Sequence, residues 1–324
     1  MSEYEYSKYV TTKERIRETV DKYGVAILPN VINDSQCEQM LSGLWDYFEH
    51  ITCTWITPIN RNKPETWKEI YKLYPLHSML FQHYSAGHCH ASWLLRQDPA
   101  IVDIFASLWK CKPEDLLVSF DGLSFNMPPE QTNRGWNLQN TWYHTDQSYT
   151  RNDFESLQSW ITALDVNEGD ATLAFLEGSN RYHKDFATHF NITDKSDWYK
   201  LKTEEEQFYK DKGCVPKKIQ CPKGSLVFWD SRTIHCGSEA LKGRSESNLR
   251  AVIYLCYTPR AWITKGNLAK KTKAFDELRT TNHYPHKPKL FSKEPRTYGG
   301  PVPSITPIET PTLTPLGRRL AGFD

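Results

Sequence analysis

The segment Trp142-Tyr-His144-Thr-Asp146 places a histidine and an aspartate two residues apart. In a β-strand, residues two apart project from the same face, so this imidazole and this carboxylate would point at one position. With a third ligand, such a pair can hold Fe(II) and leave three coordination positions open, as non-haem oxygenases require. The sequence therefore offers His144 and Asp146 as candidate metal ligands.

A second His-x-Asp pair, His183 and Asp185, competes with the first. It follows the turn Gly178-Ser-Asn180 and opens a polar stretch. In that context we expect a surface role for His183 rather than metal binding.

The second half of the chain adds a histidine and an arginine to strand-like apolar runs. His235 comes just past the run 224–229, and Arg250 leads into the run 251–257. An unpaired interior charge costs several kcal/mol, so Arg250 needs a partner. A guanidinium can hold an organic dicarboxylate bidentately, and an internal carboxylate is the alternative partner. We expect Arg244 to be solvated and Arg260 to lie at the far end of the strand.

The elements that must position these residues change in character along the chain. The first third indicates helices over 13–22, 34–50 (capped by Asp34 or Ser35) and 96–110, around a short strand at 25–28. From Leu116 onward, β-favouring runs alternate with turns, at 116–120, 138–144, 156–164, 172–176, 225–229 and 251–257. This pattern predicts an all-β core, a barrel or sandwich, with flanking helices.

We expect one structural domain built from three parts. Residues 1–115 form a helical and strand region that packs on the barrel, and residues 116–260 form the core, with a mostly helical insertion at about 184–212. Residues 261–324 form a basic helix and a proline-rich arm, which is either loose or wrapped on the barrel.

The amino-acid composition and charge limit the kinds of protein that this chain can be. The 324 residues are 39% hydrophobic and 24% charged, which is globular composition, and no apolar run approaches the roughly 20 residues of a membrane span. The chain has 40 basic and 39 acidic residues, a balance that does not favour a nucleic-acid partner. From Ile263 onward, however, there are eleven basic and five acidic residues, so a nucleic-acid partner for this region is not excluded. The eight cysteines form no CxxC pair, so we expect them to be reduced thiols. The first residues are acidic and do not resemble a secretory signal, so we expect a cytoplasmic protein.

The order of these residues resembles that of the Fe(II)/2-oxoglutarate dioxygenases. In that family a His-x-Asp pair is followed by a later histidine after a glycine-led strand and by an arginine on the next strand. More specifically, the chain resembles the phytanoyl-CoA dioxygenase-like (PhyH) family. The resemblance includes the entry strand Tyr23-Gly-Val-Ala-Ile-Leu-Pro-Asn-Val-Ile32 and the stretches 157–166 and 174–181. It covers roughly residues 23–260.

The resemblance implies a double-stranded β-helix of the jelly-roll or cupin-like kind. It implies Fe(II) bound by His144, Asp146 and His235, and 2-oxoglutarate whose far carboxylate meets Arg250. It also implies Trp160 as a residue of the cosubstrate pocket. The family's hydroxyl donor two residues after the distal histidine is Gly237 here, so Ser238, one residue further on, is the candidate partner of the carboxylate.

The implied reaction hydroxylates a small organic substrate with O2 and releases succinate and CO2, and ascorbate is a possible supporting reagent. Related halogenases carry a small residue where this chain has Asp146, so hydroxylation is the expected outcome. Tyr143, Thr145 and Gln147 alternate with the ligands and should face away from the metal. The family's Gly-Ser-His turn ends in Asn180 here, which removes a side chain expected near the site entrance.

Other hypotheses remain open. One is a zinc site at His83, His88 and His90 with Cys89 or His77, although a loop over the barrel mouth suits these histidines better. Others are a non-catalytic jelly-roll binding module and a cupin-type metal enzyme that does not use 2-oxoglutarate. The aromatic residues before the barrel form either a substrate pocket or, more commonly, core: Trp45, Tyr47, Trp55, Trp67, Tyr71 and Tyr74.

Overall fold

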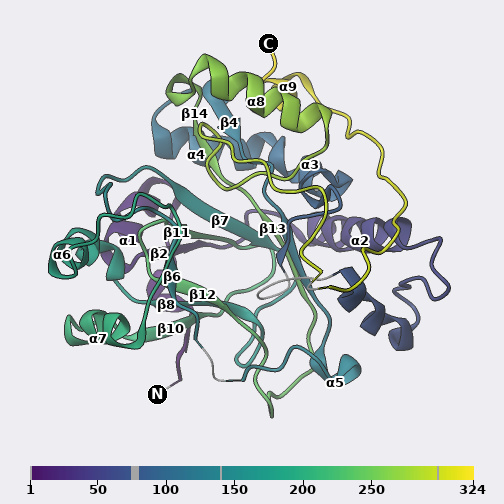
Figure 1. The fold of residues 1–324 in the computed structure, drawn as a ribbon, viewed down its shortest axis with the longest axis horizontal. Helices are drawn as coiled ribbons and strands as arrows, with labels where there is room; N and C mark the ends of the chain where they lie inside the picture. Colours follow the sequence, from purple (N-terminus) through teal and green to yellow (C-terminus); the bar gives the residue numbers. More distant parts are fainter. Residues whose placement is uncertain (1, 74–79, 139–140, 298) are drawn as a thin grey trace.

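Two six-stranded sheets lie at the centre of the molecule, with helices outside them (Figure 1). The computed structural model describes residues 2–73, 80–138, 141–297 and 299–324. The first sheet has the order β1 (Tyr4–Glu5), β10 (Pro216–Ile219), β8 (Thr172–Leu176), β12 (His235–Ser238), β6 (His144–Thr145), β9 (Tyr199–Lys200). The second has the order β2 (Val25–Leu28), β11 (Leu226–Asp230), β7 (Leu157–Thr162), β13 (Arg250–Tyr254), β5 (Leu123–Asn126), β3 (Leu80–Phe81). A separate pair joins β14 (Tyr257–Pro259) to β4 (Leu116–Val118).

The second sheet is buried on both faces, which explains its continuous apolar runs. Along β11, Val227 and Trp229 enter a core shared with strands of the first sheet. Leu226 and Phe228 enter the larger core under the helices. The alternation of β-strand side chains thus supplies two cores from one strand. The prediction of a mostly β core with flanking helices is confirmed.

The helices mainly follow the predicted pattern, with differences at their ends. Their bounds are α1 (Ile16–Tyr23), α2 (Asp34–Ile51), α3 (His90–Arg96), α4 (Pro99–Trp109), α5 (Pro129–Thr132), α6 (His183–His189), α7 (Thr203–Asp211), α8 (Lys265–Asp276) and α9 (Pro315–Ala321). Helix α2 is capped by Asn33, whose side chain accepts a hydrogen bond from the Gln36 N–H, and not by Asp34 or Ser35 as predicted. In the described ranges, no helix combines the length and the apolar character that a membrane crossing demands.

Six strands of the two sheets, as the structure describes them, were missing from the predicted set: β1, β3, β5, β9, β10 and β12. The predicted run 251–257 is divided between β13 and β14. Of the predicted strand 138–144, the structure shows β6 at its end, and residues 139–140 lie outside the described part. The predicted insertion contains α6, β9 and α7.

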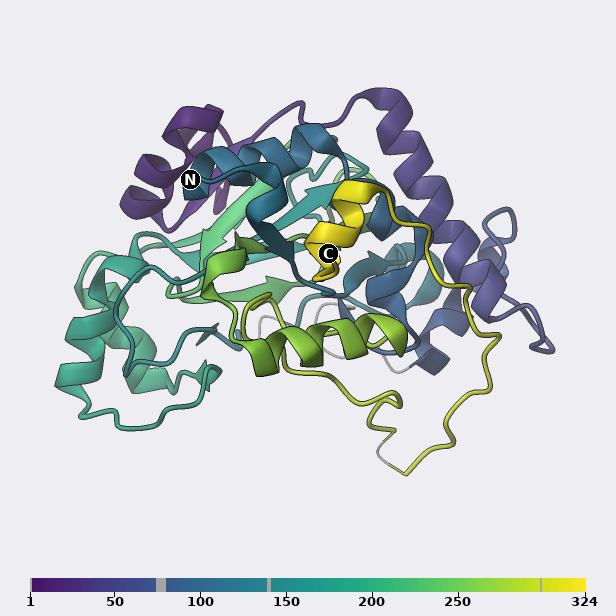
Figure 2. The ribbon, with the colours of Figure 1, turned by 90° about the horizontal axis from the view of Figure 1, so that it is seen from above.

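The C-terminal arm runs from α8 along α2 and returns to α9 (Figure 2). The Thr306 N–H donates to the Ile51 carbonyl at 2.9 Å, and the Trp55 indole N–H donates to the Ser304 carbonyl at 2.6 Å. The arm ends in α9, where Leu320 is fully buried in the larger core. The arm is therefore wrapped on the molecule, and its last helix contributes to the core.

Candidate active site

The structure brings the three predicted ligands together across two antiparallel strands. His144 begins β6, His235 begins β12, and the two residues are direct cross-strand partners. One potential ligand atom from each of His144, Asp146 and His235 lies within 4.8 Å of the others. The Asp146 carboxylate lies 3.7 Å from His144 Nε2 and 3.3 Å from His235 Nε2. Among the described residues this is the one group of three or more such side chains that could hold a metal ion.

Hydrogen bonds behind the histidines orient them toward a common point. His144 Nδ1 lies 3.3 Å from the Trp142 carbonyl, and His235 Nδ1 lies 2.8 Å from the Thr233 carbonyl. A carbonyl only accepts, so each Nδ1 carries the hydrogen and each Nε2 keeps its lone pair for a metal. Burial acts to raise the pKa of the Asp146 carboxyl, but His144 and His235 outweigh it and hold that pKa below its usual range.

Gln158 supports the aspartate. It lies two residues before Trp160 on β7 and therefore on the same face. Its side-chain amide donates to Asp146 Oδ2 at 2.8 Å and to the Ser231 hydroxyl at 3.3 Å. The amide fixes one carboxylate oxygen and leaves the other for a metal, which favours monodentate coordination.

Replacing Gln158 by leucine should therefore weaken metal binding by about 10- to 100-fold, the usual effect of removing such a supporting contact. Iron affinity measured by anaerobic titration checks this, with Gln207→Leu on the exposed face of α7 as the same substitution at a remote site. Equal iron affinity in the two variants would show that Gln158 does not support the site.

Arg250 lies in the same cavity as the three ligands. It is 8% exposed, donates from Nη1 to the Ala171 carbonyl at 3.1 Å, and its guanidinium lies 4.9 Å from the centre of the Trp160 ring. Within the described residues it forms no ion pair with a carboxylate. The indole N–H groups of Trp160 and Trp229, also in the cavity wall, have no hydrogen-bond partner there. Both indole nitrogens are themselves buried.

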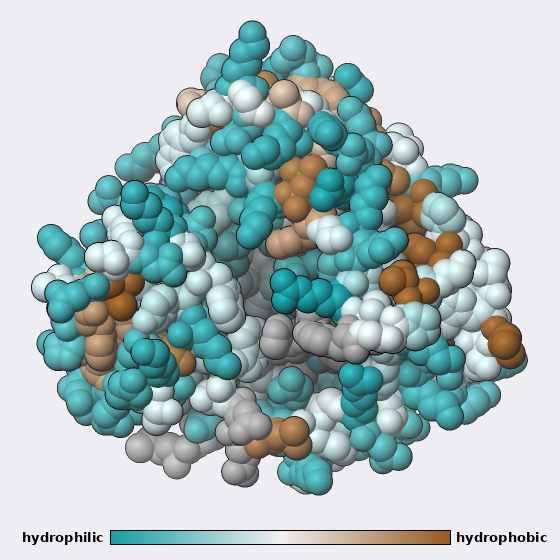
Figure 3. All heavy atoms as spheres, in the orientation of Figure 1, coloured by the Kyte–Doolittle hydropathy of each residue, from teal (hydrophilic) through white to brown (hydrophobic). Residues whose placement is uncertain are grey.

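The cavity has a volume of about 550 Å³. Figure 3 shows a hollow near the middle of the face seen in Figure 1. Strands of both sheets supply about half of its lining residues, and adjoining loops add Gln82, Asp121, Trp142 and Asp146. Two later segments complete the lining. These segments contribute Ser196, Asp197 and Trp198 from the insertion, and Asn282, His283, Tyr284, Lys289 and Phe291 from the region after α8.

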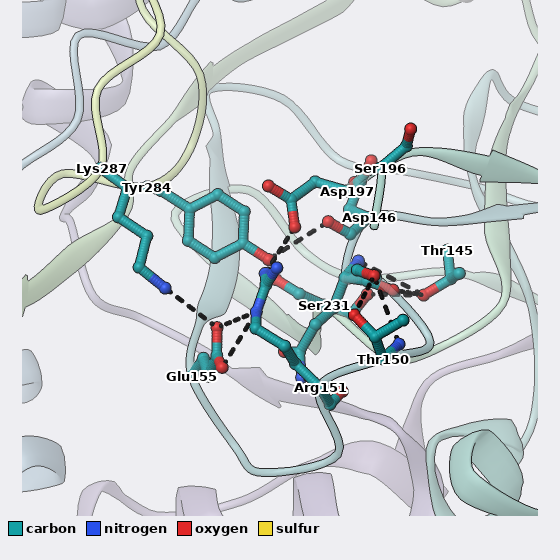
Figure 4. A network of polar contacts seen from close by, with 12 residues as sticks. Thr145, Asp146, Thr150, Arg151, Glu155, Ser196, Asp197, Ser231, Tyr284 and Lys287 are labelled. Carbon is teal, nitrogen blue, oxygen red and sulfur yellow. Dashed lines mark hydrogen bonds and ion pairs between the residues drawn. The ribbon is translucent and has the colours of Figure 1, made fainter. Parts of the chain in front are cut away.

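A polar network centred on Arg151 joins the two closing segments (Figure 4). Arg151 pairs with Asp197 of the insertion at 2.5 Å and with Glu155 at 2.8 Å. Glu155 also pairs with Lys287 at 3.5 Å, and the Tyr284 hydroxyl donates to the Asp146 carbonyl at 3.2 Å. The network thus ties the wall of the cavity to the loop that carries the aspartate ligand.

Not every predicted site residue lies in the cavity. Trp160 lines it, as expected, but Ser238 does not. On β12, Gly237 shares the face of His235, whereas Ser238 is on the opposite face, where it accepts a hydrogen bond from the Asn137 amide at 2.8 Å. The assignment of Ser238 to the cosubstrate is therefore corrected.

The residues next to the ligands in sequence point away from the metal site, as the alternation of side chains along a strand predicts. Tyr143 packs in the core under α6 and α7, and Thr145 donates to the Ser231 carbonyl at 3.0 Å. Gln147 is buried, and none of these three residues lines the cavity. Asn180 lies away from the entrance, since its amide donates to the Val20 carbonyl at 3.2 Å.

The competing histidines have structural positions. His183 is 1% exposed and stacks on Tyr149, so the expected surface role is wrong, and Asp185 is exposed. His88 is fully buried against Trp93 and Phe120, and burial lowers its pKa to about 3.

The proposed zinc cluster is not assembled among the described residues. His90 is exposed on α3, and His83 lines a separate cavity of about 290 Å³. These histidines therefore do not cover the barrel mouth as expected. His77 lies outside the described residues.

Of the two further expectations about arginines, the one for Arg244 is wrong and the one for Arg260 agrees with the structure. The Arg244 side chain is 2% exposed and pairs with Glu130 and Asp170, each at 2.7 Å, so it is not solvated. Arg260 follows β14 and donates to the Arg319 carbonyl at 2.7 Å, which anchors α9.

The aromatic residues before the barrel are core or packed against it. Trp45 and Tyr47 are buried, and the partly buried ones are Trp55, Trp67 and Tyr71. Tyr74 lies outside the described residues.

Sequence reasoning missed Asp121, Gln158, His283 and Tyr284 as cavity residues. Gln158 could have been found from the alternation along β7, which puts it beside Trp160. The others lie in segments without strand periodicity, and nothing local in the sequence indicated that they reach the site.

Comparisons with known proteins find a matching family model, a curated relative and solved structures of similar fold. The family model for phytanoyl-CoA dioxygenase (PhyH) matches residues 20–245, which include all three ligands and end before Arg250. A curated relative, "Ava biosynthesis cluster protein O" of Aspergillus versicolor, is 24% identical over 213 residues, and the match covers 63% of this chain and 66% of that protein. The chain thus spans slightly less than two thirds of that relative's length.

Solved structures of similar fold cover nearly the whole chain. The hypothetical protein JW0805 of Escherichia coli, at high pH, has a TM-score of 0.60 and 14% identity over 98% of this chain and 85% of its own. The putative oxidoreductase of Salmonella typhimurium LT2 has a TM-score of 0.58 and 13% identity over 97% of this chain and 86% of its own. At such identity the similarity shows the fold alone.

Proposed function

Because the chain belongs to the phytanoyl-CoA dioxygenase family, we propose that it is an Fe(II)- and 2-oxoglutarate-dependent oxygenase that hydroxylates a small organic molecule. The observation that carries the proposal is the convergence of His144, Asp146 and His235 in the cavity that also contains Arg250. By its name, the curated relative belongs to a biosynthesis cluster, which supports a small-molecule substrate.

The donor set fits Fe(II). Two imidazole nitrogens and one carboxylate make a facial triad, which leaves coordination positions open for other ligands. We assign the metal to His144, Asp146 and His235. The carbonyls behind the histidines and the Gln158 amide are the supporting contacts that such a site requires.

The wall around Arg250 fits 2-oxoglutarate. Its guanidinium can hold the far carboxylate through two parallel hydrogen bonds, and the ring of Trp160 packs against the guanidinium. An internal carboxylate, the alternative partner for Arg250, is not found among the described residues.

The overall reaction would convert a substrate C–H bond, O2 and 2-oxoglutarate into an alcohol, succinate and CO2. One oxygen atom enters the alcohol and the other enters succinate. Bound iron supplies the activation of O2, and the chain supplies orientation and exclusion of water. Asp146 occupies the position that a halide would need, which favours hydroxylation over halogenation, and the Arg151 network holds the cavity wall in place.

We further infer that the two sheets form the double-stranded β-helix of this enzyme class. On this assignment residues 116–260 are the catalytic core, with residues 1–115 packed on it and residues 261–324 as the arm, in one structural domain. Support comes from β2, which joins the second sheet from the N-terminal part, and from α9, which joins the larger core from the arm.

The test is a succinate-release screen over small-molecule classes: amines and amino acids, secondary metabolites and acyl thioesters. With Fe(II), ascorbate and 2-oxoglutarate the protein should release succinate slowly without a prime substrate and faster with one. A chelator should abolish both rates. Absence of release together with absence of 2-oxoglutarate binding at millimolar concentration would contradict the proposal and favour a non-catalytic binding module.

A further inference from the structure

We propose that the prime substrate carries a positively charged nitrogen, an ammonium or guanidinium group, and that Asp121 binds it. This inference rests on the proposed function and names the substrate class of the same site. Asp121 lines the cavity that contains the metal ligands, although it is only 8% exposed.

The carboxylate of Asp121 has no cation partner in the described part of the chain. Its Oδ1 accepts a hydrogen bond from the Gly122 N–H at 2.8 Å, and no side chain donates to it there. The neighbouring Arg96 donates at 2.6 Å to the main-chain carbonyl of Asp121 and not to its carboxylate. A buried carboxylate with one hydrogen bond is costly unless a ligand supplies the remaining contacts.

The main chain around Asp121 is held in place, so the carboxylate is already positioned. Arg96 is fully buried and also donates to the Gly87 carbonyl. A Cβ atom at Gly122 would collide with the Phe81 carbonyl, which shows how closely β3 approaches this turn. Burial raises the pKa of Asp121 to about 7, an effect that Arg96 opposes and Asp146 reinforces. A bound cation would stabilise the ionised form.

Apart from Lys289, the other charges of the cavity have partners or assigned ligands. Asp146 belongs to the metal and Arg250 to 2-oxoglutarate, and Asp197 is paired with Arg151. Lys289 is exposed. Since Fe(II) and doubly charged 2-oxoglutarate neutralise each other, Asp121 is the negative charge left inside for the prime substrate.

Asp121 and Arg250 lie toward opposite ends of β13. Arg250 begins the strand opposite Asn126, whereas the Tyr254 N–H at its other end donates to the Gly122 carbonyl at 3.4 Å. Four residues of strand correspond to roughly 13 Å. The cosubstrate held at Arg250 therefore leaves the end near Asp121 for the prime substrate.

Aromatic side chains of the same cavity suit a cationic group. Trp142, Trp198, Tyr254 and Phe291 line it, and aromatic faces attract ammonium and guanidinium ions. Trp198 is 52% exposed and its ring lies 5.7 Å from that of His144, so it contacts both solvent and a metal ligand.

The first arm of the test measures the ligand-free protein. Asp121→Asn removes a buried charge that has no partner, so the melting temperature should rise by roughly 2 °C or more. A carboxylate with a structural role would give the opposite result. Asp185→Asn, at an exposed aspartate in the first turn of α6, is the matched control. It loses a favourable interaction with the helix dipole, so it should not raise the melting temperature.

The second arm measures succinate release with matched probes: tryptamine against tryptophol, and phenethylamine against phenethyl alcohol. The amines should stimulate wild-type release at least about tenfold more than the alcohols, and Asp121→Asn should reduce this preference to about twofold or less. Any one of three results would overturn the inference. The first is an unchanged or lowered melting temperature of Asp121→Asn. The others are equal stimulation of the wild type by amine and alcohol, and an amine preference retained in Asp121→Asn. If instead the wild type released no basal succinate and bound no 2-oxoglutarate, the proposed function itself would fail.

Discussion

Replacing His235 by alanine should abolish stoichiometric iron binding and reduce 2-oxoglutarate-dependent succinate release at least about 1000-fold. Loss of one supporting contact already costs about 10- to 100-fold in metal affinity, and this variant loses a ligand itself. The substitution removes one of three donors that meet across β6 and β12, so the remaining pair cannot complete the triad. Iron content after anaerobic reconstitution, measured together with succinate release, checks the prediction.

Two histidines provide controls for the His235 variant. His90→Ala, at an exposed position on α3, should leave iron content and stability unchanged. His183→Ala, in the second His-x-Asp pair, removes a buried ring that stacks on Tyr149 and should lower stability by about 2 kcal/mol while the folded protein still binds iron. Iron bound normally by the His235 variant, or lost from folded His183→Ala, would contradict the assignment of the site.

Replacing Arg250 by alanine should raise the KM for 2-oxoglutarate at least about 100-fold without loss of iron binding. A hydrogen bond to a charged group contributes about 1.5–3 kcal/mol, and a bidentate guanidinium–carboxylate contact has two of them. Arg250→Lys keeps the charge but loses the planar fork, so an intermediate increase of about tenfold is expected. The dissociation constant of 2-oxoglutarate, measured anaerobically with Fe(II) bound, separates this effect from turnover.

Arg244 is the comparison for Arg250, because its side chain is also largely buried but pairs with Glu130 and Asp170. Arg244→Ala should lower stability and leave the affinity for 2-oxoglutarate unchanged. If Arg250→Ala behaved in the same way, Arg250 would have a structural role only. The protein would then be a metal enzyme that does not use 2-oxoglutarate.

The sequence predicted the strands with strong apolar patterns and missed those without one. The strands β7, β8 and β11 are buried along their length, so their composition alone marks them. By contrast, β12 is His-Cys-Gly-Ser and β10 is Pro-Lys-Lys-Ile, and neither has a run of β-favouring residues. Their strand conformation comes from pairing with β8 and not from local preference.

The residues of the candidate site likewise fall into those that the sequence could predict and those that it could not. His144, Asp146, His235 and Arg250 were identifiable because each adjoins a patterned strand. The contributions of the insertion and of the segment after α8 depend on contacts between residues far apart in the chain, such as the bond from Tyr284 to Asp146. The error at Ser238 has a simple geometric origin, since a shift of one residue on a strand moves a side chain to the other face.

An anaerobic crystal structure with Fe(II) and 2-oxoglutarate tests the central claim most directly. We expect one iron, identified by its anomalous signal, bound by His144, Asp146 and His235, and 2-oxoglutarate extending from it with its far carboxylate on the Arg250 guanidinium. Iron at any other group of side chains, or 2-oxoglutarate bound with no contact to Arg250, would contradict the account.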